Sequence, residues 1–328
     1  MNEDAEVQKL LESVVLHKVD AEKGEGLELA KTHGVQVYPT FLMVDDQIHP
    51  IDRWLGYTKP LLDQKMGVAL ADLSTIDEKR ARFESSPSPD LAVRLADYDA
   101  ASGQYADAVT LYRKAEQLDP KVSRAPEIFD ATFSGYRKQA FEKSAVLEAA
   151  DAALKMADPG QILDVSERMM YFAKQANDSE LNVKYLKTAI ERTKDSADER
   201  VVQRRDALMP DYVLLVEKNP TKAVELRRAG MPEGWMEDPG QLNNYAWWAF
   251  ENGVDQKEAL ALARKGAELA PAGKEKAMIL DTAAELCNAL DNCHEAIELT
   301  KQAIAEDPEN EYYKGQLERF QEILATKS

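Results

Sequence analysis

The strongest constraint on the fold is a stretch of helix-forming sequence that occurs three times along the chain. Each copy contains an alanine twelve residues before a proline, and each follows an amphipathic stretch. Small residues let two helices approach closely, and proline ends a helix. The repeating unit is therefore predicted to be a pair of antiparallel helices. The matching residues are Ala108 and Pro120, Ala259 and Pro271, and Ala296 and Pro308, in the ranges 103–120, 253–271 and 290–308.

The repeating unit resembles the tetratricopeptide repeat (TPR), whose period is about 34 residues. The resemblance is good for residues 89–120, 240–271 and 277–308, whereas residues 121–235 keep the periodicity of helix pairs but lose the signature. It implies an all-α, TPR-like helical-repeat domain over residues 89–328, stacked as a continuous solenoid. In proteins of this type, the first helix of each pair lines a groove that binds peptides.

The composition of the chain changes near residue 74. Upstream, residues 14–20 and 40–45 are rich in β-branched and aromatic side chains, which favours strands, and residues 24–34 between them have a helical pattern. Downstream, a proline- and serine-rich segment precedes a sequence dominated by Ala, Leu, Glu and Lys. We therefore predict an α/β domain over residues 1–73, a linker over residues 74–88 and a mostly helical remainder.

Residues 4–73 resemble the second half of a thioredoxin-like domain. The predicted elements follow the order of that family: a strand ending in Val-Asp, a helix, the sequence Tyr38-Pro39-Thr40, and a hairpin to a glycine-containing edge strand. The resemblance implies a cis peptide bond before Pro39 and a peptide-binding role for Tyr38, Pro39 and Thr40. In the family this loop faces a catalytic Cys-x-x-C motif, which is absent here.

The absent segment also includes the central strand of that fold. In the family, this strand lies between the strands that correspond here to residues 14–20 and 40–45. Without it, buried N–H and C=O groups lack partners, at a cost of about 1–3 kcal/mol each. Two interpretations remain open. Either Met1 is a truncated or misassigned start, which we expect, or this chain is a family member that evolved as a half-domain. As written, the chain lacks a signal peptide and is predicted to be cytoplasmic; a missing leader would make it periplasmic or exported.

The two cysteines do not form a redox motif. Cys287 and Cys293 are six residues apart and flank the turn between two predicted helices, so we expect buried packing residues. The alternative is a disulfide or thiol pair assisted by His294. No histidine, cysteine or carboxylate set has the spacing of metal ligands, and no phosphate-binding loop or nucleophile motif occurs. The sequence therefore predicts no catalytic residues, no metal and no cofactor.

An aromatic cluster, NNYAWWAF, lies in the first helix of the repeat over residues 240–271. Tyr245 and Trp248 fall on one helical face and are predicted to be core residues. Asn244 and Trp247 point elsewhere and, together with Asn243, are candidate contacts for a peptide in the groove. The alternative is that Trp247 packs on a neighbouring helix, because large aromatic side chains are more often buried than displayed.

The net charge of the chain limits the class of partner. A formal charge of −18 at pH 7 disfavours nucleic acid and anionic membranes, because phosphates repel an acidic surface. A neutral or basic protein or peptide is the predicted partner. Two functions remain: a TPR-type protein-interaction scaffold with a redox-inactive thioredoxin-like module, or a fragment of a thiol-disulfide oxidoreductase whose Cys-x-x-C motif lies upstream of Met1.

Overall fold

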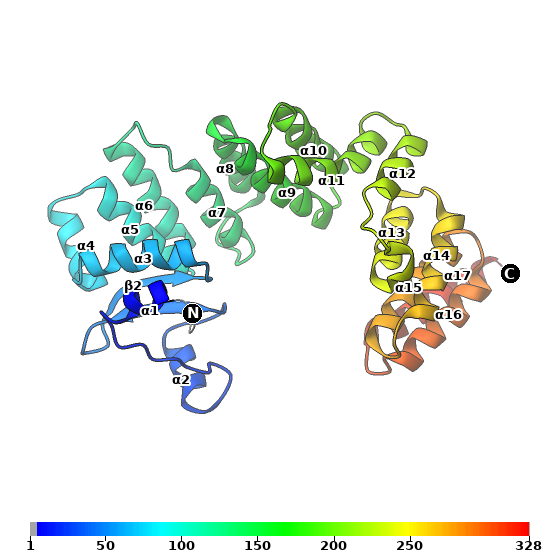
Figure 1. Cartoon of the computed structure of the whole chain (residues 1–328), viewed down its shortest axis with the longest axis horizontal. Helices are drawn as coiled ribbons and strands as arrows, with labels where there is room; N and C mark the ends of the chain where they lie inside the picture. The colour runs from blue at the N-terminus through cyan, green and yellow to red at the C-terminus, as the bar shows by residue number, and fades with distance from the viewer. Residues whose placement is uncertain (1–4, 328) are drawn as a thin grey trace. The chain divides into compact units, whose positions relative to one another are not determined.

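The computed structural model describes residues 5–327 and divides into two compact units, one up to residue 161 and one from residue 162 (Figure 1). The first unit contains α1 (Ala5–Leu11), α2 (Gly24–Thr32), β1 (Thr40–Val44), β2 (Pro50–Leu55), α3 (Lys59–Ala71), α4 (Ile76–Ser85), α5 (Pro89–Ala101), α6 (Tyr105–Leu118), α7 (Ala125–Tyr136) and α8 (Lys143–Met156). The boundary between the units falls within α9 (Pro159–Gln175). The second unit continues with α10 (Ser179–Thr193), α11 (Glu199–Leu215), α12 (Pro220–Ala229), the 3₁₀ helix η1 (Trp235–Glu237), α13 (Pro239–Asn252), α14 (Gln256–Leu269), α15 (Lys274–Ala289), α16 (Cys293–Glu306) and α17 (Glu311–Lys327).

The three predicted repeats are helix pairs, as the alanine and proline spacing indicates. They correspond to α5 with α6, α13 with α14, and α15 with α16, and the two helices of each pair pack on each other. The alanines of the repeat, Ala108, Ala259 and Ala296, are completely buried. Close approach also explains Gly266, where a Cβ atom would lie 3.3 Å from a methyl group of Ile279. Residues 121–235 form helices as well, with α7 against α8, α10 against α11 and α11 against α12.

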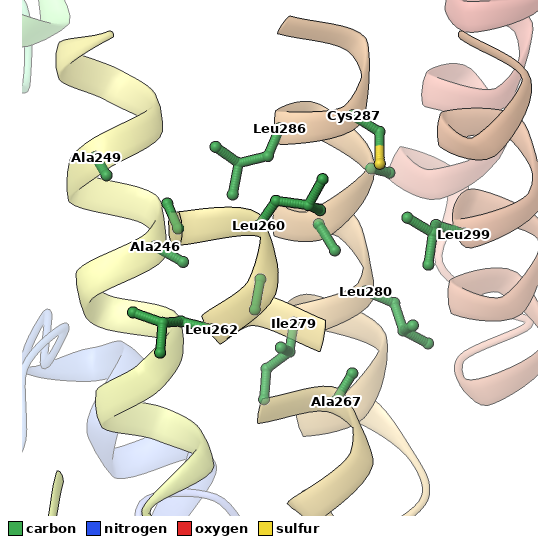
Figure 2. Close-up of a cluster of buried hydrophobic side chains, with 14 of the residues drawn as sticks. Ala246, Ala249, Leu260, Leu262, Ala267, Ile279, Leu280, Leu286, Cys287 and Leu299 are labelled. Carbon is green, nitrogen blue, oxygen red and sulfur yellow. The ribbon is translucent and has the colours of Figure 1, made fainter. Parts of the chain in front are cut away.

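One apolar cluster holds the C-terminal helices of the second unit together. Its buried members come from α11 through α17, and Figure 2 shows the part in which α13, α14, α15 and α16 meet. Leu242, Ile279 and Leu286 are completely buried, and Leu299 of α16 packs from the other side of α15. Small side chains at the helix contacts and leucines between them therefore form a continuous core.

The predicted thioredoxin-like sheet is not formed by the residues that the structure describes. They contain one sheet of two antiparallel strands, in which β1 pairs with β2. Residues 14–20, predicted as a strand, have no regular structure, and Val15 is 98% exposed. β-branched residues favour a strand only where a neighbouring strand and a packing surface are present. Val14 packs against the cluster around Trp54, but no strand among the described residues pairs with this segment, so the prediction from composition is wrong here.

The two strands nevertheless separate two layers of helices. Trp54 of β2 stacks on Phe41 of β1, with ring centroids 5.2 Å apart, and packs with Leu62 of α3. Arg53 points to the opposite face, where its guanidinium donates to the His33 carbonyl at 2.6 Å, at the end of α2. This alternation places α2 and α3 on opposite sides of the strands (Figure 1). The peptide bond between Tyr38 and Pro39 is cis, the geometry predicted for this proline.

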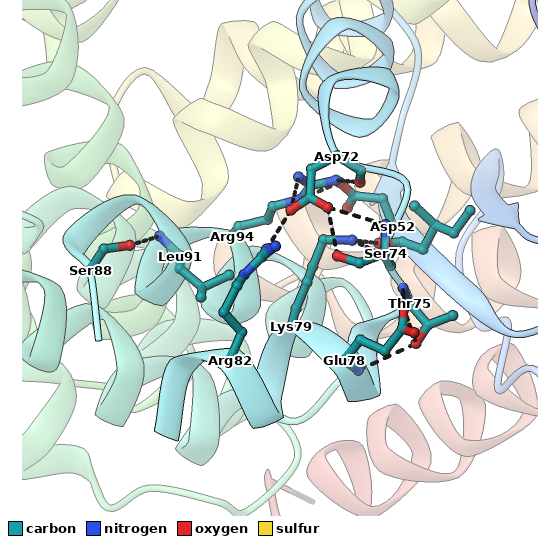
Figure 3. Close-up of polar contacts among 11 residues, drawn as sticks. Asp52, Asp72, Ser74, Thr75, Glu78, Lys79, Arg82, Ser88, Leu91 and Arg94 are labelled. Atoms are coloured by element: carbon teal, nitrogen blue, oxygen red, sulfur yellow. Dashed lines mark hydrogen bonds and ion pairs between the residues drawn. The ribbon is translucent and has the colours of Figure 1, made fainter. Parts of the chain in front are cut away.

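The segment predicted as a linker, residues 74–88, contains the helix α4. The helix begins with a reciprocal cap, in which the Thr75 N–H donates to the Glu78 carboxylate at 2.8 Å and the Glu78 N–H donates to Thr75 Oγ1 at 3.3 Å (Figure 3). Lys79 is completely buried and donates to the carbonyl groups of Ile51 and Ser74. A segment with a buried charged side chain is part of the fold, so the serine- and proline-rich linker is confined to the residues after α4.

An ion-pair cluster connects the strands to the first repeat helix. Arg94 of α5 lies 3.3 Å from the Asp52 carboxylate of β2 and 3.5 Å from the Asp72 carboxylate (Figure 3). Asp52 and Arg94 are both largely buried, and burial raises the pKa of Asp52 above its usual range, against the opposing effect of the Arg53 N–H and of Arg94. The strands and the helices α4 and α5 therefore share one packed unit.

Candidate functional site

The candidate binding residues lie on α13, whose two ends are set by local sequence signals. At the start, Asp238 caps the helix by accepting a hydrogen bond from the Gln241 N–H at 2.9 Å, and Pro239 occupies the first turn. At the end, Gly253 adopts the left-handed conformation with φ of 65°, which glycine does without strain. These signals fix where α13 begins and ends.

Tyr245 and Trp248 are core residues, as predicted from their helical spacing. Tyr245 is completely buried, and Trp248 is 7% exposed. The indole N–H of Trp248 donates to the carboxylate of Asp211 on α11 at 2.7 Å. Both aromatic rings therefore hold α13 against neighbouring helices, and their polar atoms have partners.

A polar network around Tyr245 also fixes α13 to α12 and to the start of α14. The Tyr245 hydroxyl donates to the Asp255 carboxylate, and Arg228 donates to the hydroxyl at 3.1 Å and to Asp255 at 2.9 Å. Burial, followed by the bond to Asp255, raises the pKa of Tyr245 to about 12. The phenol therefore stays protonated near neutral pH, and the underside of α13 is rigidly supported.

The three candidate contact residues of α13 differ in exposure. Asn244 is exposed, whereas Trp247 is partly buried and its ring lies 5.2 Å from that of Phe250. Asn243 is only 6% exposed, and its side-chain oxygen has no hydrogen-bond partner. Asn244 and Trp247 are therefore accessible from outside, while Asn243 lies beneath them.

A polar cluster on α15 and α17 was not predicted from the sequence. Asp281 and Glu285 of α15 are each 7% exposed, although both are carboxylates. The Glu285 carboxylate accepts hydrogen bonds from Gln316 and Arg319 of α17. Burial, and then the neighbouring charge of Glu285, raises the pKa of Asp281 to about 7. One Asp281 oxygen has no hydrogen-bond partner.

The repeat register relates this cluster to α13. When Pro271 is aligned with Pro308, Asp281 occupies the position of Asn244. In space α13 packs on α15, and the bonds of Glu285 join α15 to α17. We call the surface formed by these three first helices of successive pairs the first-helix face. The repeat alignment could therefore have identified Asp281 from the sequence, as the residue equivalent to Asn244.

Both cysteines are buried thiols. Cys287 of α15 is completely buried and Cys293 of α16 is 3% exposed. Burial, with a smaller effect of the nearby Glu295 carboxylate, raises the pKa of Cys287 to about 11. A thiol with this pKa is almost entirely protonated at neutral pH and reacts slowly, so its position suits the packing role.

The loop of Tyr38, Pro39 and Thr40 lies in the first unit. Tyr38 is 56% exposed, and the Thr40 hydroxyl donates to the Val37 carbonyl at 2.6 Å. All three residues line a cavity beside β1. The described residues contain no group of three or more His, Cys, Asp or Glu side chains arranged to hold a metal ion. Over the same part of the chain, no helix has the length and apolarity needed to cross a membrane.

Comparison with known proteins finds similarity only among solved structures. No protein-family model matches the sequence, and no curated protein matches it. A tetratricopeptide repeat protein from Parabacteroides merdae ATCC 43184 is 14% identical with a TM-score of 0.43, over 80% of this chain and 95% of that chain. PilW, a widely conserved type IV pilus biogenesis factor, is 15% identical with a TM-score of 0.41, and the match covers 70% of this chain and 97% of PilW. The TPR2AB domain of yeast Sti1, in complex with pHSP90, is 17% identical with a TM-score of 0.27, and the match covers 71% of this chain and 96% of that domain.

Proposed function

We propose that the chain is a protein-interaction scaffold of TPR type, and that its first-helix face binds an extended segment of a partner protein. The observation that carries this proposal is the arrangement of α13, on which Asn244 and Trp247 are accessible while Tyr245 and Trp248 anchor the other side. A rigid helix with accessible polar and aromatic side chains is the arrangement that helical-repeat proteins use to hold peptides.

The expected partner segment is neutral or basic. The chain carries a formal charge of −18, which favours a basic segment over an acidic one. Exposed tyrosine and methionine side chains continue along the first-helix face at Tyr312 and Met278, which are 53% and 48% exposed. These side chains suit a segment with apolar residues beside a basic group.

Replacement of Trp247 with Ala tests this function against loss of folding. We expect Trp247→Ala to abolish capture of a partner, identified by mass spectrometry after pull-down, while the melting temperature changes little. The matched control is Trp248→Ala, which should lower the free energy of unfolding by about 3–5 kcal/mol because it empties a buried site. Equal destabilisation by both substitutions, with partner capture unchanged, would contradict the proposal.

The proposal also assigns residues 4–73 to a thioredoxin-like module without redox activity. The order of α2, the cis-proline loop, β1 and β2 supports the assignment, and the only thiols of the chain are the buried Cys287 and Cys293. Disulfide exchange requires an accessible thiolate. We therefore expect no reduction of insulin by this chain with dithiothreitol as electron donor. Turnover that disappears in Cys287→Ser or Cys293→Ser would show that these thiols react.

A further inference from the structure

A second cavity, of about 300 Å³, lies in the first unit. Its walls come from the end of β2, from α3 and from the helices α5, α6 and α7. Every lining residue lies between residues 53 and 134, so the cavity is separate from the first-helix face, which belongs to the second unit. Its volume is at the small end of the range for ligand pockets, which suits one or two side chains of a partner.

Small side chains leave this cavity open, and aromatic rings form part of its walls. Ala100 and Ala101 of α5 and Ala131 of α7 line it at positions where larger side chains would fill the space. Trp54 of β2 and Tyr105 of α6 supply rings to the same walls. A hollow with this lining accommodates the hydrocarbon part of a long side chain.

Three carboxylates also line the cavity: Asp97 of α5, and Glu127 and Asp130 of α7. Glu127 and Asp130 are three residues apart, so they lie on the same side of α7, where Asp130 is exposed and Glu127 partly exposed. The hydroxyl of Tyr112, another lining residue, donates to Asp97 at 2.6 Å. Burial, and then the charges of Asp97, Glu127 and Asp130, raise the pKa of Tyr112. The three carboxylates therefore act together on a charge placed in this cavity.

The basic side chains of the chain occupy only part of these carboxylates. Lys65 of α3 pairs with Asp97 at 2.6 Å, and Arg124 pairs with one oxygen of Glu127 at 3.0 Å. The other Glu127 oxygen receives no hydrogen bond from the described residues. Arg53 lines the cavity as well, but its guanidinium donates to two backbone carbonyls that follow α2. A further cation therefore has carboxylate oxygens to bind on the α7 side.

Two buried donors in the wall have no acceptor. The indole N–H of Trp54 and the Nε–H of Arg53 lack a hydrogen-bond partner among the described residues, although these residues are only 4% and 6% exposed. Both side chains line the cavity. A backbone carbonyl of a bound segment supplies the kind of acceptor that such donors need.

We propose that this cavity binds an arginine side chain within an extended segment of a partner protein. The hollow takes the hydrocarbon part of the side chain, and Glu127 and Asp130 bind the guanidinium. Arginine fits better than lysine, because a planar guanidinium stacks on aromatic rings such as Tyr105 and forms paired hydrogen bonds with carboxylates. The site goes beyond the proposed function, because it lies in the first unit and binds independently of α13.

The peptide acetyl-Ala-Ala-Arg-Ala-Ala-amide is a direct probe. Its matched control contains citrulline, which keeps the shape of arginine but carries no charge. The four indole N–H signals of the full chain report where a peptide binds, because Trp54 lies in the first unit and Trp235, Trp247 and Trp248 lie in the second. In two-dimensional NMR, we expect the arginine peptide to shift only the Trp54 signal and the citrulline peptide to bind at least about tenfold more weakly.

The double variant Glu127→Gln and Asp130→Asn removes both charges of α7 from the cavity and keeps the size of the side chains. We expect the dissociation constant of the arginine peptide to rise at least about tenfold. The melting temperature should stay near that of the unmodified chain, because ion pairs at exposed positions add little to stability. The control Glu84→Gln removes an exposed charge of α4 outside the cavity and should leave binding unchanged.

The same titrations contain the outcomes that contradict the proposal. Absence of a shift at Trp54, equal binding of the citrulline peptide, or equal weakening by Glu84→Gln and the double variant overturns it. A shift confined to Trp247 and Trp248 overturns it too, although that result agrees with the proposed function. Spermidine that shifts the Trp54 signal at lower concentrations than the peptide also overturns it, because the occupant is then a small polyamine.

Discussion

At the scale of single residues, Asp281 is the group whose titration matters most for the second unit. Its carboxylate is buried beside Glu285, with Tyr312 and Arg319 of α17 as its other polar neighbours. Its pKa is about 7 in the folded state, compared with 3.8 as the ordinary value. The folded state therefore binds the proton more tightly than the unfolded state does, and this contribution to stability is lost as the pH rises through 7.

This titration predicts a pH dependence that one substitution removes. Between pH 6 and pH 8, the free energy of unfolding of the second unit should fall by about 1 kcal/mol. In Asp281→Asn, which keeps the size of the side chain but cannot ionise, this decrease should be absent. Urea unfolding of both proteins at the two pH values measures the difference. An equal decrease in the variant would show that Asp281 is not the titrating group.

At the scale of elements, the predicted and observed structures differ for physical reasons. The helix pairs were predictable because Ala259 and Ala296 mark close contacts and Pro271 and Pro308 follow the helix ends. The helix α4 was missed because its sequence is highly charged, although Thr75 and Glu78 have the spacing of a capping box. A strand at residues 14–20 was predicted from side-chain type, which does not supply a pairing partner.

The candidate site shows the same division between local and tertiary information. The buried positions of Tyr245 and Trp248 followed from helical spacing alone. The burial of Asn243 and the contacts of Glu285 with α17 depend on which helices pack together. The types of the side chains do not predict this packing. Sequence alone therefore located the helix of the site better than the side chains that complete it.

The contact between Arg94 of α5 and Asp52 of β2 tests whether the strands belong to the same unit as the first repeat. Removing one partner of a buried ion pair is destabilising, because the remaining charge loses its nearest counter-charge. We expect Arg94→Met to lower the free energy of unfolding by about 3–5 kcal/mol, and Asp52→Asn to lower it less, because Arg94 keeps the Asp72 carboxylate at 3.5 Å. The double variant should lose less than the sum of the two, because neither charge then remains. Additive losses in this double-mutant cycle would show that the two side chains do not interact.

At the scale of the whole molecule, each described apolar cluster lies within one unit. The cluster around Trp54 and Leu62 is confined to the first unit, and the cluster around Leu242 and Ile279 to the second. Cooperative unfolding follows the packed core, so we expect two separate thermal transitions. Residues 159–328, expressed alone, should reproduce one of them in calorimetry. A single transition in the full chain, or an unfolded 159–328 fragment, would contradict this prediction.

Site-specific photo-crosslinking shows whether the first-helix face of the second unit binds a protein partner. A benzoylphenylalanine side chain replaces Asn244, which is exposed on α13, and in a matched control replaces Ala261, which is exposed on α14. After irradiation in a lysate of the source organism, mass spectrometry identifies the adducts. The proposed function predicts a specific protein adduct from position 244 and none from position 261. Equal adducts from both positions, or an adduct from position 261 alone, would contradict it.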